Sequence, residues 1–414
     1  MGLLVTNLSK IITPLGNEPR KGKEMSELLE ISQGAIAIEE GKIAGIGKEK
    51  EIKETFGNLP ILDGKGRVAL PGFVDPHTHL VFAGSREKEF VMRIQGKSYV
   101  EIAQEGGGIR STVEAVRRAS LEELVESALI RADRLMDFGV TTVEVKSGYG
   151  LATEHEIKQL EAIKKLNQLH VMDFIPTFLG AHEVPLEYKD NKGEYLKILL
   201  EEMIPEVGRR NLARFCDVFC EAHVYSVEES RVILERAKEY GMTPKLHADE
   251  IEPMGGAELA AEVGAISADH LGAISEEGMK RLAESGVIAV LLPSTSFYLR
   301  LPHYAPARAM IEKGIPIALA TDLNPGSSMT ENFPFILTLA CLYLGLTPQE
   351  ALTAATLNAA CAIGEGKNCG SLEMGKKADI LLVNIPNLEY LPYHYGVNHV
   401  DMVLKKGEIV RRNI

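Results

Sequence analysis

The segment ALPGFVDPHTH, at residues 69–79, joins a short apolar run to two histidines and is the most informative stretch for the fold. Residues 69–74 have the composition of a buried strand, and His77 and His79 follow directly. Side chains two positions apart in an extended chain point to the same side, so both imidazoles can converge on one metal ion. A doubly wound sheet would instead place a glycine-rich phosphate turn after its first strand, and this segment is not such a turn.

Short apolar runs continue to alternate with amphipathic stretches through the middle of the chain. Strands are predicted at residues 69–74, 141–145, 174–178, 215–220, 244–246, 265–268, 287–292 and 317–320. Helices are predicted at residues 121–138, 154–169, 194–207, 227–240, 257–263, 275–285 and 304–313. Eight strands alternating with helices indicate an α/β fold of the (β/α)8 TIM-barrel type, in which functional residues follow the carboxyl ends of the strands.

Both ends of the chain are β-rich and contain little predicted helix. Strands are expected at residues 3–8, 35–38, 42–46, 378–384, 402–405 and 408–411, with hairpin turns at Gly41 and Gly407. Neither end is large enough for a core of its own, and chain termini often lie close together, so we expect them to complete one sheet. The predicted division is residues 1–67 and 366–414 for a composite β domain and residues 68–365 for the barrel.

The composition is that of an ordinary soluble globular protein, with 414 residues of which 45% are hydrophobic and 25% charged. The formal net charge is −13, which disfavours a nucleic-acid partner. No apolar stretch reaches the roughly 20 residues that cross a bilayer, and the N-terminus lacks the pattern of a cleaved signal. Five cysteines without a CxxC pair argue against a disulfide framework. We expect a cytoplasmic protein with neither a nucleic-acid nor a membrane partner.

Three further predicted strands carry polar side chains at their carboxyl ends. The fifth is followed by His247 and Glu250, the sixth by His270 and the eighth by Asp322. Each alone is an ordinary polar residue at a strand end, but agreement among four strands favours a shared site. Histidines and a carboxylate suit an ion such as zinc, which activates water near neutral pH, so the pattern predicts metal-assisted hydrolysis. Asp322 can bind the ion and the water, Glu250 can move a proton to a leaving nitrogen, and His270 can orient the reacting groups.

The segment at residues 69–79, together with His247, His270 and Asp322, resembles the amidohydrolase superfamily over essentially the whole chain. The resemblance implies a metal-dependent (β/α)8 hydrolase with a small β-sandwich built from both termini. It also implies which residues bind the metal: His77, His79, His247 and Asp322.

The resemblance also bears on the number of metal ions. Superfamily members with two ions usually carry a carboxylated lysine on the fourth strand. Residues 215–225 contain Asp217, Glu221 and His223 but no lysine. Lys146 follows the second strand, where we expect it to be structural or to form a wall of the pocket. We therefore expect one ion per subunit, with Glu221 as a bridging ligand to a second ion as the alternative.

Three residues near the ends of the first three strands predict what the site binds, namely Arg86, Tyr149 and His182. Each alone is ordinary, but all three lie on the rim that faces the expected metal. A guanidinium can bind a carboxylate through two parallel hydrogen bonds. Because the protein is acidic overall, an anionic substrate needs a local cation, and Arg86 can supply it.

A narrower resemblance is carried by the stretches VFAGSR, KSGYG, FLGAH, HADE and TDLNPG and by the Asp269-His270 pair. They resemble the branch of the superfamily that acts in histidine degradation. The resemblance implies hydrolytic opening of 4-imidazolone-5-propanoate to N-formimidoyl-L-glutamate by a homodimer that uses Zn²⁺ or Fe³⁺. It further implies that Arg86, Tyr149 and His182 hold the substrate and that Glu250 contacts its ring. It also implies that Asn324 and Gly326 bind the product, with Ser327 beside them.

Two alternative functions stay open. A cytosine or guanine deaminase, or another cyclic amidohydrolase, shares the features around Glu250 and His270, but an uncharged base does not require Arg86 or Tyr149. A non-catalytic scaffold that kept the barrel for oligomer assembly is expected to have lost metal ligands, and all four are present here. Apart from function, the three glycines at residues 106–108 lie in a long connection of the kind that often forms a lid or binding loop.

Overall fold

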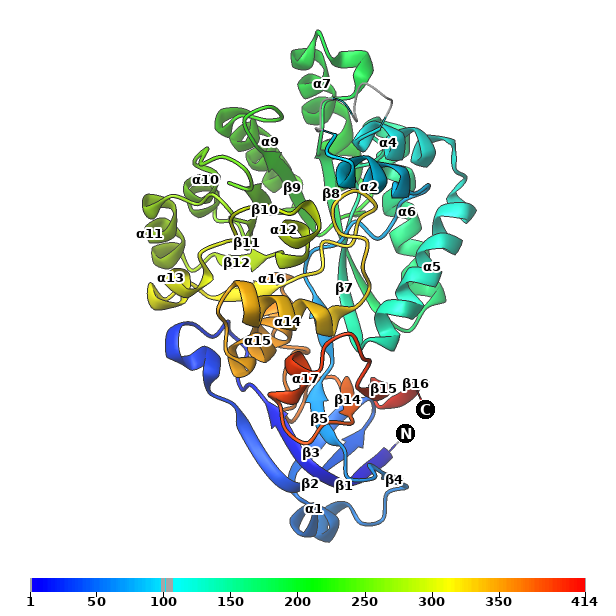
Figure 1. Cartoon of the computed structure of the whole chain (residues 1–414). Coiled ribbons are helices and arrows are strands. Elements are labelled where there is room, and N and C mark those ends of the chain that lie inside the picture. The colour runs from blue at the N-terminus through cyan, green and yellow to red at the C-terminus, as the bar shows by residue number, and fades with distance from the viewer. Residues whose placement is uncertain (1, 98–100, 102–106, 414) are drawn as a thin grey trace.

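The computed structural model describes residues 2–97, 101 and 107–413. A barrel surrounded by helices stands beside a separate sheet, and both chain termini lie at that sheet (Figure 1). The sheet has eight strands in the order β16-β15-β14-β5-β1-β2-β3, with β4 paired to β1. Its strands are β1 Gly2–Thr13, β2 Leu29–Glu39, β3 Lys42–Lys48, β4 Ile61–Asp63, β5 Val68–Pro71, β14 Ile380–Val383, β15 Val400–Lys405 and β16 Glu408–Arg412. The prediction that both ends of the chain complete one sheet is confirmed.

The second sheet is the predicted barrel, with eight parallel strands that follow one another in chain order. Its strands are β6 Phe73–Asp75, β7 Val140–Lys146, β8 Asp173–Ala181, β9 Phe215–Cys220, β10 Thr243–Ala248, β11 Ser267–His270, β12 Ile288–Leu291 and β13 Ile317–Leu319. The first and last strands meet just beyond their carboxyl ends. There the His79 N–H donates to Leu323 O at 3.0 Å and the Asp322 N–H donates to His77 O at 3.1 Å. These bonds hold together the two segments that carry His77, His79 and Asp322.

The strand predicted over residues 69–74 is divided between the two sheets. β5 pairs antiparallel with β14 in the terminal sheet, whereas β6 pairs parallel with β7 in the barrel. The chain crosses at Gly72, where a Cβ atom would collide with the Thr141 side chain. The prediction of one strand is wrong because both sheets bury this segment, and a continuous apolar run does not show where the chain changes sheet.

Helices connect the barrel strands and cover the outside of the barrel (Figure 1). The α-helices are α1 Glu49–Phe56, α2 Glu87–Ile94, α4 Ile109–Arg118, α5 Leu121–Asp137, α6 Thr153–Leu169, α7 Lys192–Ile198, α8 Ile204–Arg209, α9 Val227–Glu239, α10 Gly256–Val263, α11 Glu276–Ser285, α12 Pro293–Leu299, α13 Ala307–Glu312, α14 Phe333–Tyr343, α15 Pro348–Ala355, α16 Leu357–Ala362 and α17 Tyr390–Tyr393. Shorter turns are η1 Gly22–Ser26, η2 Leu186–Tyr188 and η3 Leu199–Met203. The helix predicted over 194–207 is α7, η3 and α8 in succession. Among the described residues, no helix is long and apolar enough to cross a membrane.

The interior of the barrel changes character along its axis. Near the amino ends of the strands, Phe215 and Ile288 are buried together with the side chains of α16. Further along the strands the buried side chains are charged, and Lys146 and Asp217 are both 0% exposed. Charged groups are buried only where they have partners. The layer that contains Lys146 and Asp217 therefore lies directly beneath the carboxyl end of the barrel, where a polar site is expected.

The glycine-rich connection after β6 is described only in part. Gly106 lies outside the described residues, whereas Gly108 precedes α4 with a φ of 82°, a conformation that favours glycine. The lid or binding loop expected for residues 106–108 therefore stays a prediction.

Candidate metal centre and active site

Three histidines meet at the carboxyl end of the barrel. His77 and His79 follow β6, His247 lies in β10, and one ligand atom of each lies within 4.8 Å of the other two. The ring centroid of His77 is 5.5 Å from that of His79 and 4.5 Å from that of His247. All three side chains are buried. The structure thus brings together the three histidines that the sequence predicts as metal ligands.

Asp322, which follows β13, completes this group. Its Oδ1 atom lies 3.6 Å from His77 Nε2 and 3.5 Å from His79 Nε2. Its Oδ2 atom accepts a hydrogen bond of 2.6 Å from the Thr295 hydroxyl. The backbone of Asp322 is left-handed, with a φ of 54°. Aspartate tolerates that conformation better than most residues, but it still carries strain of the kind that gathers at functional sites.

The spacing and charge of these donors fit a metal ion. Ligand atoms bound at about 2.0–2.1 Å to a tetrahedral ion stand about 3.4 Å apart, close to the 3.5 Å and 3.6 Å separations of Asp322 Oδ1 from the histidine nitrogens. His77 Nε2 is buried and has no hydrogen-bond partner among the described residues. Burial lowers the pKa of His77 and of His79 well below its usual value, so both imidazoles are neutral and able to coordinate.

Two of the histidines are oriented by buried carboxylates that sequence reasoning missed. His77 Nδ1 donates to Asp269 Oδ2 at 2.6 Å, and His247 Nδ1 lies 3.0 Å from Asp217 Oδ2. Burial works to lower the pKa of His247, but the charge of Asp217 outweighs it, so that pKa is raised. Such partners fix the ring orientation and tautomer of metal-binding histidines. The available signal is a carboxylate at the third position of both β9 and β11, inside a parallel barrel.

A buried lysine lies between these two carboxylates. Lys146 Nζ is 2.8 Å from Asp217 Oδ2, 2.8 Å from Glu144 Oε1 and 3.7 Å from Asp269 Oδ2. Burial works to lower the pKa of Lys146, but the three carboxylates outweigh it and raise that pKa. Lys146, expected to be structural or to form a pocket wall, is therefore a buried ammonium beside the carboxylate partners of His77 and His247.

Glu250 and His270 form a second pair next to the histidines. His270 Nδ1 is 3.6 Å from Glu250 Oε1, and the His270 ring centroid is 5.4 Å from that of His77. Burial, reinforced by the charge of Asp322, raises the pKa of Glu250 to about 8. Burial also lowers the pKa of His270 well below its usual value. At neutral pH the pair is a carboxylic acid beside a neutral imidazole, so Glu250 can donate a proton.

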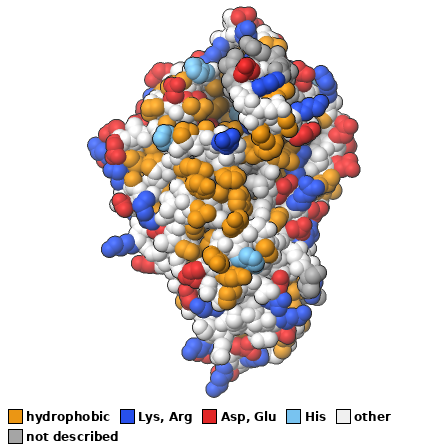
Figure 2. Space-filling model, in the orientation of Figure 1, with side chains coloured by type: hydrophobic (Ala, Val, Ile, Leu, Met, Phe, Trp, Pro, Cys, Tyr) orange, Lys and Arg blue, Asp and Glu red, His pale blue; other side chains and the backbone are white. Residues whose placement is uncertain are grey.

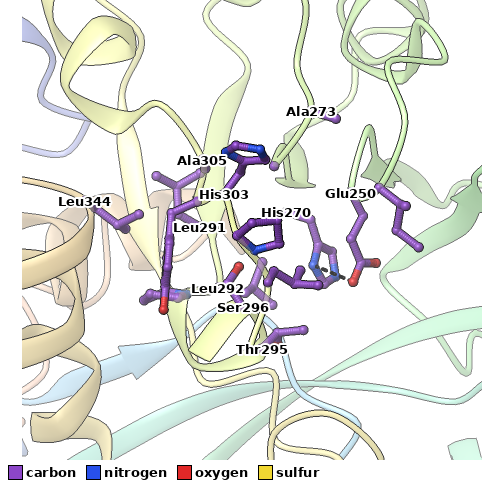
Figure 3. Close-up of a pocket in the computed structure, with 16 residues that line it drawn as sticks. Glu250, His270, Ala273, Leu291, Leu292, Thr295, Ser296, His303, Ala305 and Leu344 are labelled. Atoms are coloured by element: carbon purple, nitrogen blue, oxygen red, sulfur yellow. Dashed lines mark ion pairs between the residues drawn. The ribbon is translucent and has the colours of Figure 1, made fainter. Parts of the chain in front are cut away.

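This pair lines a cavity of about 340 Å³. Figure 3 shows Glu250 and His270 facing each other, with a dashed line for their 3.6 Å contact, and apolar side chains such as Leu291 and Leu344 among the rest of the lining. His303 also lines the cavity. Apolar surroundings favour the neutral form of a carboxyl group, which is consistent with the raised pKa of Glu250.

Arg86 directly precedes α2 and is held in place by Glu89. Its Nε and Nη2 atoms donate to the Glu89 carboxylate at 2.7–3.0 Å, and its side chain is only 9% exposed. The guanidinium packs against Gly326, where a Cβ atom would collide with Arg86 Nη1. Arg93 Nη1 donates to Gly326 O at 2.7 Å and ties the same turn to α2. The cation predicted on the rim thus points to the turn after Asp322 and not to solvent.

Tyr149 and His182 lie beside His79. The ring centroids of Tyr149 and His182 are 5.6 Å and 4.9 Å from that of His79, and His182 stacks on His79 at 16°. His182 Nδ1 donates to Gly148 O at 2.9 Å, which leaves Nε2 for a ligand. Burial raises the pKa of Tyr149 and lowers the pKa of His182 to about 3, so both are neutral hydrogen-bonding groups at neutral pH.

The expected product contacts Asn324, Gly326 and Ser327 lie in one tight turn after Asp322. Asn324 Oδ1 accepts hydrogen bonds from the N–H groups of Gly326 and Ser327, each at 2.8 Å. Asn324 Nδ2 donates to Asp322 O at 2.7 Å. The Asn324 side chain therefore orders the backbone next to Asp322, and contact of this turn with a product stays a prediction.

Glu221 and His223 are not brought to the metal-binding group. The two carboxylate oxygens of Glu221 accept hydrogen bonds from the N–H groups of Ala222 and Ile251, each at 3.0 Å. His223 is exposed. Within the part of the chain that the structure describes, neither belongs to a group able to hold a metal ion. The alternative in which Glu221 bridges a second ion has no support in this geometry.

Known proteins are similar to this chain in sequence and in structure. The sequence model of the amidohydrolase family matches residues 68–410. An imidazolonepropionase from Alkaliphilus metalliredigens (strain QYMF) is 52% identical over 412 residues, covering 99% of this chain and 97% of that protein. Another from Alkaliphilus oremlandii (strain OhILAs) is 53% identical over 410 residues, covering 98% and 97%. The solved structure of E. coli guanine deaminase aligns with a TM-score of 0.73 over 100% of both chains, but its identity of 17% shows likeness of fold alone.

Proposed function

The chain belongs to the imidazolonepropionases of the amidohydrolase family, and we propose that its site opens the ring of 4-imidazolone-5-propanoate with water to give N-formimidoyl-L-glutamate. The observation that carries this proposal is the identity of 52–53% with imidazolonepropionases over 98–99% of the chain. The side chains grouped at the end of the barrel are of the kinds that this step of histidine degradation needs. They supply metal ligands, a proton donor and a cation for the substrate carboxylate.

The metal-binding residues in this proposal are His77, His79, His247 and Asp322, with one ion per subunit. An ion held there would polarise the ring carbonyl and lower the pKa of a bound water molecule to about 7. Imidazole nitrogens with one carboxylate suit both zinc and iron, so we propose Zn²⁺ or Fe³⁺. Metal analysis of the purified protein distinguishes the two.

Asp322 and Glu250 divide the proton transfers in the proposed reaction. Thr295 donates to Asp322 Oδ2, which leaves Oδ1, on the side of the histidines, to accept a proton from the attacking water. The water oxygen forms a bond to the ring carbonyl carbon, and the bond from that carbon to the ring nitrogen breaks. Glu250, with its pKa raised to about 8, is protonated at neutral pH and gives its proton to the departing nitrogen. His270, neutral and beside Glu250, orients the reacting groups.

Substrate binding is assigned to Arg86, Tyr149 and His182. Arg86 receives the propanoate carboxylate, because its guanidinium is held at the turn that follows Asp322 and keeps an Nη1 atom directed at Gly326. Tyr149 lies close enough to both Arg86 and Asp322 for their charges to act on its pKa. A substrate that spans from the metal ligands to Arg86 therefore passes Tyr149, and the free Nε2 atom of His182 lies beside the same path.

Product identification tests the proposed function against its alternatives. Metal-loaded protein is incubated separately with 4-imidazolone-5-propanoate, cytosine and guanine, and the products are identified by mass spectrometry. We expect N-formimidoyl-L-glutamate from the first compound and no ammonia from the other two. Ammonia from either base without ring opening favours a deaminase, and no turnover by protein that retains its metal favours a scaffold.

The proposed contact of Arg86 with the substrate carboxylate predicts that replacing Arg86 weakens substrate binding more than it slows turnover. We expect Arg86→Gln to raise KM about 10- to 100-fold with a smaller effect on kcat, since a hydrogen bond to a charged group contributes about 1.5–3 kcal/mol. Steady-state kinetics measure the effect. Arg118→Gln is the control, because Arg118 is exposed and its ion-pair partner within the described part of the chain is Glu114 on the same helix, α4. An unchanged KM in Arg86→Gln contradicts the assignment.

We also propose the homodimer that the sequence resemblance implies. Figure 2 shows apolar side chains gathered over the face formed by α12, α14 and α17. Phe297, Leu342 and Tyr343 are 44%, 71% and 49% exposed there. Exposed apolar patches of this kind commonly mark subunit interfaces. Sedimentation analysis of the purified protein tests the oligomeric state.

A further inference from the structure

A second group able to hold a cation lies inside the barrel, next to the proposed metal centre. One atom each of His77, Asp217 and Asp269 lies within 4.8 Å of the other two. All three side chains are 0% exposed. Asp217 Oδ2 is buried and lies 2.8 Å from Lys146 Nζ and 3.0 Å from His247 Nδ1. This oxygen therefore already faces a positive charge inside the barrel.

The cation that this group holds is the ammonium of Lys146. Its Nζ atom lies 2.8 Å from Asp217 Oδ2, 2.8 Å from Glu144 Oε1 and 3.7 Å from Asp269 Oδ2. The Lys146 side chain is 0% exposed, so bulk water does not reach it. Three carboxylates around one buried position would repel one another strongly without a positive charge at their centre.

A neighbouring buried lysine has a different environment. Lys245 Nζ donates to Ser267 Oγ at 2.8 Å and lies near two backbone carbonyl oxygens, at 3.4 Å and 3.5 Å. Among the described residues, Asp269 is the one carboxylate within 4.0 Å of this atom, at 3.7 Å. Lys245 therefore matches Lys146 in burial and charge but does not stand at the centre of several carboxylates.

We propose that the Lys146 ammonium is a built-in cation which takes the second cation position of this barrel and so limits the site to one metal ion. The inference rests on the proposed function, because it presupposes a metal ion at the histidines. Removing both the charge and the volume of Lys146 leaves the oxygens of Glu144, Asp217 and Asp269 around an open space. Carboxylate oxygens alone suit Mn²⁺ better than the softer ions that imidazoles prefer.

Titration of the zinc-loaded protein with Mn²⁺ tests the proposal. Wild-type protein and variants are loaded with zinc, freed of excess zinc by gel filtration and titrated with Mn²⁺ while free Mn²⁺ is measured by electron paramagnetic resonance. We expect Lys146→Ala to bind about one Mn²⁺ per chain at least 10-fold more tightly than the wild type. Zinc outcompetes manganese at the histidines, so this manganese reports the second position.

Two control variants separate space from charge. Lys146→Met removes the charge but fills the volume, and Lys245→Ala removes the other buried lysine. We expect neither to bind the extra Mn²⁺. The proposal is overturned if Lys146→Ala binds no more Mn²⁺ than the wild type. It is also overturned if Lys245→Ala binds as much additional Mn²⁺ as Lys146→Ala.

A second variant covers the case in which Lys146→Ala does not fold. The double variant Glu144→Gln with Lys146→Ala removes one negative and one positive charge, so the net charge of the buried group is unchanged. It should bind the extra Mn²⁺ through Asp217 and Asp269, and failure to do so when folded overturns the proposal. Wild-type protein that retains neither zinc nor iron overturns the proposed function instead, so the two failures are distinguishable.

Discussion

Asp322→Asn is expected to abolish zinc retention and ring hydrolysis together, with kcat/KM falling by about 1,000-fold or more. The variant removes the proposed negatively charged ligand and the proposed acceptor of the water proton in one change. Asparagine is preferable to alanine here, because the φ of 54° at Asp322 is one that asparagine also tolerates. The measurements are zinc content after dialysis and the rate of imidazolone consumption.

The fold of the metal-free Asp322→Asn variant should not be weakened. Burial raises the pKa of Asp322 to about 6 from 3.8, so in metal-free protein the charged carboxylate disfavours folding once the pH exceeds both values. Removing that charge at pH 8 should raise the free energy of unfolding by up to about 3 kcal/mol. Denaturant unfolding of both metal-free proteins checks this sign. A folded variant that keeps zinc and full activity would refute the assignment of Asp322.

The proposed metal ligands were accessible to sequence reasoning because each lies at the end of a recognisable strand. His77 and His79 share one side of an extended segment, and His247 and Asp322 come at the ends of later strands. In a parallel barrel all these ends meet at one rim, so local patterns along the chain translate directly into a common location. Agreement between separate strands therefore predicted the group without knowledge of any distance.

The supporting charges were not accessible in the same way. Which carboxylate faces which histidine depends on neighbours across the barrel, as in the pairs of His77 with Asp269 and of His247 with Asp217. No spacing along the chain encodes those pairs. Lys146 shows the same limit, since a lysine at a strand end is usually solvated, and only the carboxylates of three strands make its burial favourable.

Arg86 shows a third limit of sequence reasoning. An arginine in a loop carries no signal of which carboxylate holds it, and its partner Glu89 lies three residues further on, in α2. The pair keeps the guanidinium nearly buried at the turn of Gly326 before any substrate arrives. Less side-chain freedom is then lost on binding, which favours affinity for a carboxylate.

Glu250→Gln is expected to lower kcat by about 100- to 10,000-fold while zinc retention stays unchanged. Glutamine keeps the size of the side chain but cannot transfer a proton to the departing nitrogen. Steady-state kinetics and zinc content are measured on the same preparations. Glu252→Gln is the matched control, because Glu252 is exposed two residues further along the chain. Loss of zinc together with activity would show that Glu250 supports the metal centre instead.

The pH dependence separates proton donation by Glu250 from a merely steric role. The donor must be protonated, so activity should fall as the pH rises through the pKa of Glu250, which burial raises to about 8 in the metal-free site. A bound cation favours the carboxylate form and moves this alkaline limb to lower pH. The residual activity of Glu250→Gln should lack the limb, because glutamine does not titrate. If the activity of Glu250→Gln falls over the same alkaline pH range as that of the wild type, another group causes the fall. Glu250 would then act through contact and not by donating a proton.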